Sequence, residues 1–365
     1  MRTIRIDLEA IADNYKTIKR LTGGTVMAIV KADAFGHGMI EVSKKLESLN
    51  VDILGTADID EALEIRSAGI KSPIMAWLYG KDTEFDEAIT QGIQLGASTI
   101  LTLEKIAESA KRVGAEVQIH LKVDTGLGRN GAALSDWPEL VKKAVDLQSS
   151  GSINLVGVFS HLSGTSEQDD LEQLRVFEEA IATASKLGAT FKVHHIAASL
   201  AALRYPSTRL DMTRVGAALY GLDPGLETNM RQFGLRTAMR VTSEVVHVKK
   251  VPAGHGLSYG YLHKTTGESN LALVPFGYNE GFPRISAGKA EVFLNGKKYK
   301  VLARVAMDQF ILDLGSDTAQ VGDEVVIIGD GAKGEPTVED LAKASGTIND
   351  EIVTKMGGRA KRVFS

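Results

Sequence analysis

The sequence contains no cysteine. Disulfides, thiolate metal sites and a cysteine nucleophile are therefore excluded, and the absence agrees with a reducing compartment. Only 6% of the residues are aromatic, and 42 Lys and Arg nearly balance 46 Asp and Glu. This composition argues against nucleic acid as a partner, because it offers neither a polyanion-binding charge nor a surface of stacking aromatic rings.

Long apolar runs are also missing. The longest, such as LALVPF at 271–276, are far shorter than the roughly 20 residues that cross a bilayer. The N-terminal segment MRTIRIDLEAIADNYK carries acidic residues where a secretory signal needs an apolar core. These features predict a cytoplasmic protein without membrane association.

The first 235 residues alternate short apolar runs with amphipathic stretches. Eight such runs occur, at 25–31, 52–57, 73–79, 93–98, 117–123, 155–161, 193–199 and 209–219. Parallel strands joined by helical crossovers produce this pattern, and both an open doubly wound sheet and a closed (β/α)8 barrel are compatible with it. The count of eight, and the absence of GxGxxG after the first run, favour the barrel.

The pattern changes after residue 235. Strand-like segments follow at 240–251, 271–277, 290–305 and 323–329. The Asn-Gly pair at 295–296 predicts a hairpin, and 337–345 reads as a short helix. We therefore predict two domains, an α/β barrel over 1–235 and a mainly β domain over 236–365.

Lys31 ends the first apolar run, in AIVKADAFGHG. A lysine at the end of a buried strand is unfavourable unless it is paired, solvated or functional. It fits a surface lysine at the barrel rim, and it equally fits a desolvated amine that forms a Schiff base with a carbonyl. Chemistry in parallel barrels occurs where strands end, so the position qualifies for the second interpretation.

The segment HLKVDTGLGRNG at 120–131 places His120, Lys122 and Asp124 on one face of a strand. Lys122, Asp124 and Arg129 are compatible with an ordinary ion-pair network and with a ligand site. The glycines around Arg129 indicate a backbone that closely approaches another group.

Further candidates follow later strands. His161 ends the sixth run, and His195 and Ser199 lie in the seventh. Isolated histidines are more often packed core residues, and no HExxH-like spacing indicates a metal. Arg214 opens TRVGAALYG, whose glycine could present free N–H groups to a phosphate, although the chain has no Walker pattern.

Two residues of the second domain also stand out. Tyr259 lies between glycines in GLSYGY, where an aromatic side chain often covers an interface. Met307, in ARVAMDQF, is by itself more typical of core packing than of a ligand contact.

Taken together, these segments resemble the alanine racemases, pyridoxal-phosphate enzymes built from a barrel and a β domain. The resemblance runs from IDLEAIADNY to RAKRVF, and six motifs occur in the family's order: VKADAFGHG, KVDTGLGR, TRVGAALYGL, LSYG, GYNEGFPR and RVAMDQ. It implies interconversion of L-alanine and D-alanine, which supplies D-alanine for cell-wall peptidoglycan. It also implies pyridoxal 5'-phosphate as the cofactor, no metal, and a head-to-tail homodimer with shared active sites.

The resemblance assigns the acid–base roles. Lys31 would hold the cofactor covalently and act as the base for D-alanine, whereas the partner subunit's Tyr259 would act on L-alanine. Arg214 would face the pyridine nitrogen with His161 behind it. Lys122 matches a lysine that many members carry as a carbamate.

The remaining assignments concern binding. The substrate carboxylate would be held by Arg129, which Lys122 braces, and by the segment of Met307 and Asp308. The cofactor phosphate would be seated by Ser199, Gly216 and Ala217.

The chain also departs from the family pattern. Phe35 stands where a tyrosine is common, Asp350 replaces a tyrosine that touches the phosphate, Ala198 replaces an asparagine, and Ala306 replaces a frequent cysteine. A carboxylate near a dianionic phosphate is unfavourable unless it is protonated or turned away. We therefore expect an active enzyme with a weakened affinity for the cofactor.

Three other functions are compatible with parts of this sequence. A decarboxylase of the same architecture would place an acid at the ring nitrogen and use a cysteine, which disagrees with Arg214 and with the composition. A cofactor carrier without turnover would leave the second domain unexplained. A racemase for serine or for several amino acids stays open, because one hydroxyl in a pocket changes selectivity only modestly.

Overall fold

The computed structural model describes residues 1–365. Its first domain is a parallel eight-stranded sheet in the order β8-β7-β6-β5-β4-β3-β2-β9. The strands are β2 (Thr25–Ile29), β3 (Ile53–Gly55), β4 (Ile74–Ala76), β5 (Gln94–Ala97), β6 (Val117–Lys122), β7 (Ile153–Phe159), β8 (Val193–His195) and β9 (Met212–Val215). Seven of them fall within one of the eight apolar runs, and β7 begins two residues before the run at 155–161. Most of the strand residues are buried, as expected for a sheet covered on both faces.

The sheet closes into a barrel. Backbone bonds from Asp211 N–H to the His194 carbonyl (3.2 Å) and from Arg214 N–H to the Ala197 carbonyl (3.0 Å) join its two ends. Helices connect the strands on the outside: α2 (Lys31–Gly36), α3 (Met39–Glu47), α4 (Ile59–Ser67), α5 (Asp86–Thr90), α6 (Ile100–Val113), α7 (Trp137–Ser149), α8 (Glu167–Lys186) and α9 (Ser199–Arg204). The predicted (β/α)8 barrel is confirmed.

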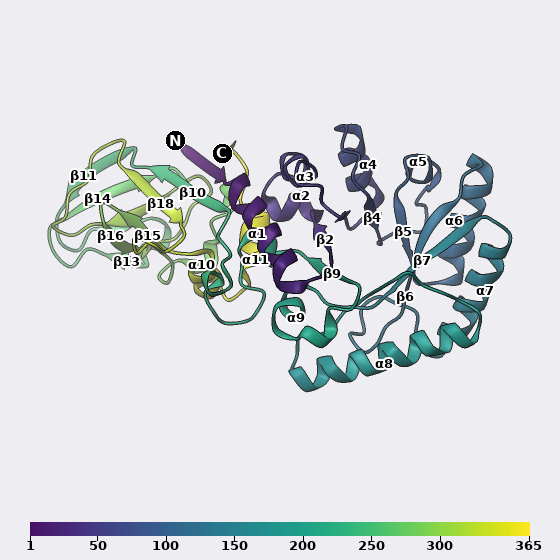
Figure 1. Ribbon diagram of the computed structural model, residues 1–365. Helices are drawn as coiled ribbons and strands as arrows, with labels where there is room; N and C mark the ends of the chain where they lie inside the picture. Colours follow the sequence, from purple (N-terminus) through teal and green to yellow (C-terminus); the bar gives the residue numbers. More distant parts are fainter.

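The second domain is mainly β, as predicted (Figure 1). Its sheets contain β10 (Met239–Glu244), β11 (His247–Val251), β12 (Gly256–Leu257), β13 (His263–Lys264), β14 (Ser269–Val274), β15 (Glu291–Leu294), β16 (Lys297–Lys300), β17 (Phe310–Asp313) and β18 (Glu324–Ile328). Asn295 and Gly296 both have positive φ in the β15–β16 hairpin, which is the geometry that an Asn-Gly turn favours. The predicted helix is α10 (Val338–Ser345), which starts at a capping box on Thr337.

Both ends of the chain cross between the domains. The N-terminal strand β1 (Arg2–Ile6) pairs with β10 and with the C-terminal strand β19 (Lys361–Phe364), so residues 2–6 belong to the sheet of the second domain. The chain then enters helix α1 (Leu8–Thr22), which packs on the barrel. Apart from these terminal segments, we propose that the barrel ends and the second domain begins near residue 235.

The C-terminal segment returns to the barrel through α11 (Asn349–Lys355). The approach to α2 is so close that a Cβ at Gly36 would lie 2.3 Å from the Val353 carbonyl oxygen. Figure 1 shows α11 beside α1 and α2, at the junction of the domains. One cluster of 96 buried apolar residues includes members of both domains, so the core is continuous across this junction.

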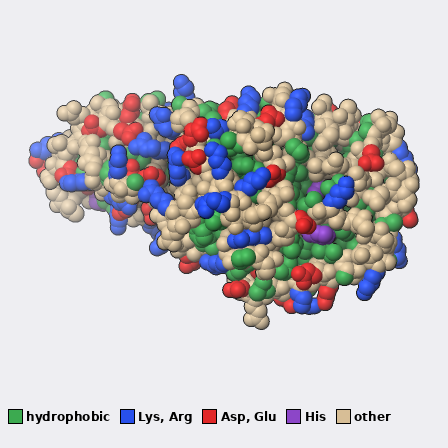
Figure 2. Space-filling view, in the orientation of Figure 1, with side chains coloured by type: hydrophobic (Ala, Val, Ile, Leu, Met, Phe, Trp, Pro, Cys, Tyr) green, Lys and Arg blue, Asp and Glu red, His purple; other side chains and the backbone are tan.

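Charge and hydropathy agree with the expectations from composition. On the face in Figure 2, basic and acidic side chains are interspersed over both domains. None of the helices combines the length with the apolar character that crossing a bilayer requires.

Candidate active site at the carboxyl end of the barrel

A cavity of about 1620 Å³ opens at the carboxyl ends of the barrel strands. Its lining includes every barrel residue that the sequence analysis selected for the site: Lys31, Lys122, Arg129, His161, Ser199, Arg214, Gly216 and Ala217. Asp350 reaches the same cavity from α11. The cavity lining does not include Tyr259, Met307 or Asp308, the three candidates from the second domain.

Lys31 begins α2 directly after β2 and is half-buried. From Ala32 to Phe35 the backbone forms a left-handed helical turn, with φ between 53° and 55°. Such a turn in L-residues costs roughly 1–2 kcal/mol per residue, so the surroundings must hold it in place. The Glu61 carboxylate accepts a hydrogen bond from Ala32 N–H (2.6 Å), and the Asp33 carboxylate accepts one from Met39 N–H (2.8 Å). Backbone strain is therefore concentrated beside the candidate catalytic lysine.

Arg214, on β9, is buried and faces neutral acceptors only. Its guanidinium donates to the carbonyls of Ser160 (2.7 Å), His195 (3.1 Å) and Ile196 (3.1 Å). Burial, and then the charge of Arg129, lower the pKa of Arg214 to about 9, which leaves it protonated at neutral pH. The structure thus fixes a cation that can only donate hydrogen bonds in the wall of the cavity.

A chain of neutral histidines supports Arg214. Arg214 donates to His161 Nδ1 (3.0 Å) and to His195 Nδ1 (3.1 Å). His195 Nε2 lies 3.0 Å from His120 Nδ1, and His120 Nε2 lies 2.9 Å from Gln94 Oε1. Because Arg214 cannot accept, His195 must carry its proton on Nε2, and His120 must then carry its proton on Nε2 and donate to Gln94.

Burial keeps these rings uncharged. It is the largest cause that lowers the pKa of His120 to about 3 and that of His161 to about 2, with Arg214 second in both. A Cβ at Gly157 would lie 2.2 Å from His120 Nδ1, so the ring needs a glycine there. The roles of Gln94, His120 and His195 in this chain were not predicted from the sequence, although the strand alternation that places His120 on the inner face was an available signal.

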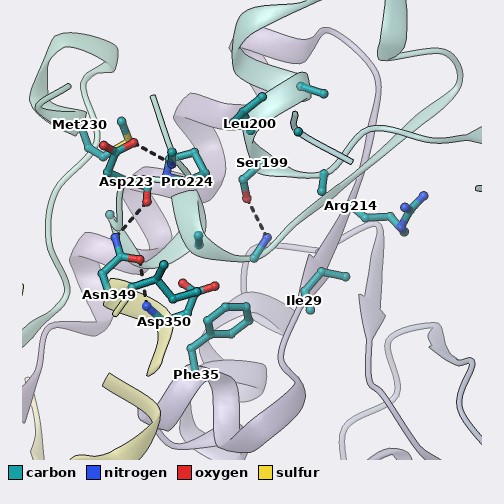
Figure 3. A pocket seen from close by; sticks show the side chains of 18 of the residues that line it. Ile29, Phe35, Ser199, Leu200, Arg214, Asp223, Pro224, Met230, Asn349 and Asp350 are labelled. Carbon is teal, nitrogen blue, oxygen red and sulfur yellow. Dashed lines mark hydrogen bonds between the residues drawn. The ribbon is translucent and has the colours of Figure 1, made fainter. Parts of the chain in front are cut away.

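A group of hydrogen-bonding residues suited to an anion lies in the same cavity as Arg214. We call it the anion seat or phosphate seat; it consists of Ser199, Leu200, Gly216 and Ala217. Ser199 Oγ, at the start of α9, accepts from Gly216 N–H (3.1 Å) and Ala218 N–H (3.3 Å) (Figure 3). The N–H groups of Leu200 and Ala217 donate to no group of the chain. Unpaired amides beside a hydroxyl are suited to phosphate oxygens. The residues present therefore fit a phosphorylated cofactor.

Gly216 is required by close packing at this seat. A Cβ there would lie 2.7 Å from Phe35 Cζ. The Phe35 ring is itself held against Tyr220, with ring centroids 5.1 Å apart. The absence of a hydroxyl at Phe35 thus leaves an apolar wall beneath the seat.

Lys122 and Arg129 complete a cationic lining. Lys122 is buried at the end of β6, with its ammonium 5.3 Å from the centroid of the Phe159 ring and no carboxylate within ion-pair distance. Burial, followed by the charges of Arg214 and Arg129, lowers the pKa of Lys122 to about 8. With Lys31 and Arg214, these residues make the cavity suitable for a ligand that carries carboxylate and phosphate groups.

The candidates from the second domain are on its surface instead. Tyr259 is 71% exposed and Met307 is 53% exposed. Asp308 accepts a hydrogen bond from Arg359 (2.7 Å), whereas the Met307 N–H donates to no group of the chain. Within one subunit, the structure does not bring Tyr259 to Lys31.

Comparisons with known proteins agree with this arrangement. The alanine racemase N-terminal domain model matches residues 6–224, and the C-terminal domain model matches 238–364. The chain is 41% identical to the alanine racemase of Thermobifida fusca, covering 99% of this chain and 97% of that protein.

Solved structures are similar over the full length. The alanine racemase from a D-cycloserine-producing Streptomyces lavendulae has a TM-score of 0.98 and 42% identity, covering 100% of this chain and 97% of that one. The Bacillus anthracis alanine racemase with bound L-Ala-P has a TM-score of 0.87 and 30% identity, covering 100% and 95%. The chain belongs to the alanine racemase family, the pyridoxal-phosphate-dependent isomerases of alanine.

Proposed function

We propose that the chain racemises alanine with two bases, Lys31 and the partner subunit's Tyr259, placed on opposite faces of the substrate α-carbon. The bound cofactor supplies an electron sink that makes the α-proton of the amino acid removable. The Lys31 Nζ takes or returns this proton on one face, and the Tyr259 phenol oxygen does so on the other. The observation that supports this proposal is that the two groups lie in different domains of one subunit, so that a phenol for the Lys31 cavity has to come from a second subunit. Lys31 lines the cavity, whereas Tyr259 is exposed on the other domain.

The cofactor would be held from several sides. Lys31 would hold it covalently, while Ser199, Gly216 and Ala217 would bind its phosphate through a hydroxyl and backbone amides. Arg214 would donate to the pyridine nitrogen. Because Arg214 keeps its proton at neutral pH, it would leave that nitrogen unprotonated.

Arg129 would bind the substrate carboxylate together with the N–H of the partner subunit's Met307, which has no acceptor within its own chain. The partner subunit's Asp308 would keep this segment in place through Arg359. Lys122 would brace Arg129 as a carbamate. The ammonium first gives up one proton to solvent, and the neutral amine then adds to the carbon of CO2 and releases a second proton, so that a cation beside Arg129 is replaced by an anion. The lowered pKa of Lys122 supports this, since it raises the fraction of neutral amine.

The functional assembly would be a head-to-tail homodimer. Several large apolar side chains are exposed on the second domain. Tyr261 and Leu262 follow Tyr259 closely in the sequence, and Tyr278 and Ile285 lie in and directly after the motif GYNEGFPR. Exposed apolar surface of this kind is typical of protein interfaces. We place the enzyme in the cytoplasm, where it would supply D-alanine for cell-wall peptidoglycan.

Mixed dimers test the shared site. Neither a Lys31→Ala chain nor a Tyr259→Phe chain forms a complete site with its own copies. In a heterodimer, however, one site joins Lys31 of one chain to Tyr259 of the other. Random mixing should restore about one quarter of the sites, because half of the dimers are mixed and one of their two sites is intact. Heterodimers that are verified by differential tagging and remain inactive would contradict the shared site.

A further inference from the structure

Asp350 places a carboxyl group in the wall of the cavity. It is the second residue of α11, and it lines the cavity together with Lys31, Phe35 and Ser199. Figure 3 shows its carboxyl group beside the Phe35 ring, directed into the space below Ser199. Its Oδ1 atom is buried and has no hydrogen-bond partner. A buried polar atom without a partner is uncommon in folded proteins, and this oxygen is free to form a hydrogen bond with a group bound in the cavity.

The helices that pack against α11 are α2, which carries Lys31 and Asp33, and α10, which carries Glu339, Asp340 and Lys343. Further charged residues are Arg362, which pairs with Asp33, Asp223 in the loop beside Asn349, and Glu351 and Lys355 on α11 itself.

Several of these side chains already have partners. Asp33 pairs with Arg362 at 2.7 Å, and Glu351 pairs with Lys355. Glu339 accepts from Asn349 (3.1 Å), which also donates to the Asp223 carbonyl (2.9 Å).

The carboxyl group of Asp350 forms no salt bridge, and Lys31 is the only charged side chain that acts on it through space. Burial raises the pKa of Asp350, and the charge of Lys31 opposes this rise only in part. The proposed function assigns Lys31 to the cofactor. A dianionic phosphate at Ser199 and Gly216 would then face an unpaired carboxyl group across an apolar wall, where an ionised carboxylate would repel it strongly.

We propose that Asp350 is a phosphate-binding residue of this chain, which takes up a proton when the cofactor binds and donates it as a hydrogen bond to a phosphate oxygen. Affinity for the cofactor then falls as the pH rises. This inference rests on the phosphate seat of the proposed function.

The sign follows from proton linkage. Asp350 holds its proton more tightly in the complex than in the free protein. Over the pH range between the two titrations, binding therefore consumes one proton, and each unit of rising pH weakens the contribution of Asp350 by up to about tenfold. An asparagine at this position donates a hydrogen bond from its amide without consuming a proton.

The test is an equilibrium titration of the full-length apoprotein with pyridoxal 5'-phosphate, followed by quenching of protein fluorescence from about pH 6 to about pH 9. Asp350→Asn should bind more tightly than the unchanged protein at the alkaline end, by about tenfold or more, with the difference shrinking towards the acidic end. Asp350→Ser, which keeps a donor in a smaller side chain, should reduce the pH dependence in the same way. Glu351→Gln removes a carboxylate from the same helix but outside the cavity, and it should match the unchanged protein.

Titration with pyridoxal, which lacks the phosphate, separates the possible outcomes. The proposal expects Asp350→Asn to have no effect on pyridoxal binding. It is overturned if Asp350→Asn leaves the binding of the phosphorylated cofactor unchanged, or strengthens it by the same factor at every pH, since the carboxylate would then stay ionised. A failure of the phosphate seat is recognised separately. In that case Ser199→Ala would not reduce the preference for the phosphorylated cofactor over pyridoxal.

Discussion

The two domains present their functional side chains in opposite ways. In the barrel, Arg214 is buried among five acceptors, and His161 and Lys122 lie at the ends of neighbouring strands. In the second domain, Tyr259 and Met307 are largely exposed. The barrel therefore forms a ligand seat from its own core, whereas the second domain offers groups that become part of a closed site only against another surface.

Exposure in the second domain does not mean that its loops are loose. A Cβ at Gly277 would lie 2.2 Å from the Met307 carbonyl oxygen, and that oxygen accepts from Asn279 N–H at 3.0 Å. Arg359 joins the buried Glu280 (2.7 Å) to Asp308 (2.7 Å). The backbone that carries Met307 is thus held in place before any partner arrives, which favours docking with little rearrangement.

The largest effect is expected when the reactive amine is removed from the barrel. Lys31→Ala should lower racemisation in both directions by on the order of 10³-fold or more, because it removes both the covalent attachment and one of the two bases. Initial rates from each enantiomer measure this. A residual rate within tenfold of the unchanged enzyme would show that another group carries the chemistry.

Removing the phenol tests the other side. Tyr259→Phe should lower racemisation by about 10² to 10⁴-fold, the usual contribution of a positioned acid or base. Exchange of the D-alanine α-proton with solvent should persist, because Lys31 still acts on that face. Proton NMR in deuterated buffer follows the exchange. Loss of exchange to the same extent as racemisation would contradict the two-base assignment.

Acidification should affect the barrel more than the second domain. Burial lowers the pKa of His37 to about 4 and of His120 to about 3, whereas unfolded histidine titrates near 6.5. Below that value the unfolded state binds more protons than the folded state. Each of these rings should then reduce stability by up to about 1.4 kcal/mol per pH unit. Urea unfolding at several pH values, monitored by fluorescence, measures the loss.

A matched variant assigns the acid sensitivity to one ring. His120→Gln removes a buried imidazole that would otherwise protonate on unfolding. Its stability should be lower than that of the unchanged protein at neutral pH but should fall less steeply on acidification. An unchanged slope would place the sensitivity elsewhere.

The smallest expected effect concerns packing at the anion seat. Gly216→Ala should weaken cofactor binding by about tenfold, because the new methyl group would press on Phe35 Cζ and overpacking costs roughly 1–3 kcal/mol. The double variant with Phe35→Leu should recover part of the affinity, which cofactor titration detects. No recovery would mean that the glycine is needed for its backbone rather than for its missing Cβ.

The barrel was predictable because its strands are buried on both faces and therefore appear as continuous apolar runs. The extension of the second sheet by β1 was not predictable, since its pairing with β10 and β19 joins segments more than two hundred residues apart in one case and at opposite ends of the chain in the other. The short strands β12 and β13 also escaped notice, because two-residue strands leave no alternation to read.

The candidate site shows the same division. The resemblance of its motifs to the alanine racemases selected Lys31, Arg214 and Ser199, and these three residues line one cavity. The left-handed turn from Ala32 to Phe35 could not be read from four residues that ordinarily avoid that conformation.

The amino-acid sequence alone thus specified which segments become barrel strands, because strands that are buried on both faces appear as apolar runs. The side chains suited to a phosphorylated aldehyde cofactor were indicated by the resemblance of the motifs to the alanine racemases. Closure of the barrel decided which side chains meet around Arg214. It placed His195 from β8 against His120 from β6, and it fixed both tautomers through Arg214. Contacts of this kind depend on where distant segments meet, which only the folded chain specifies.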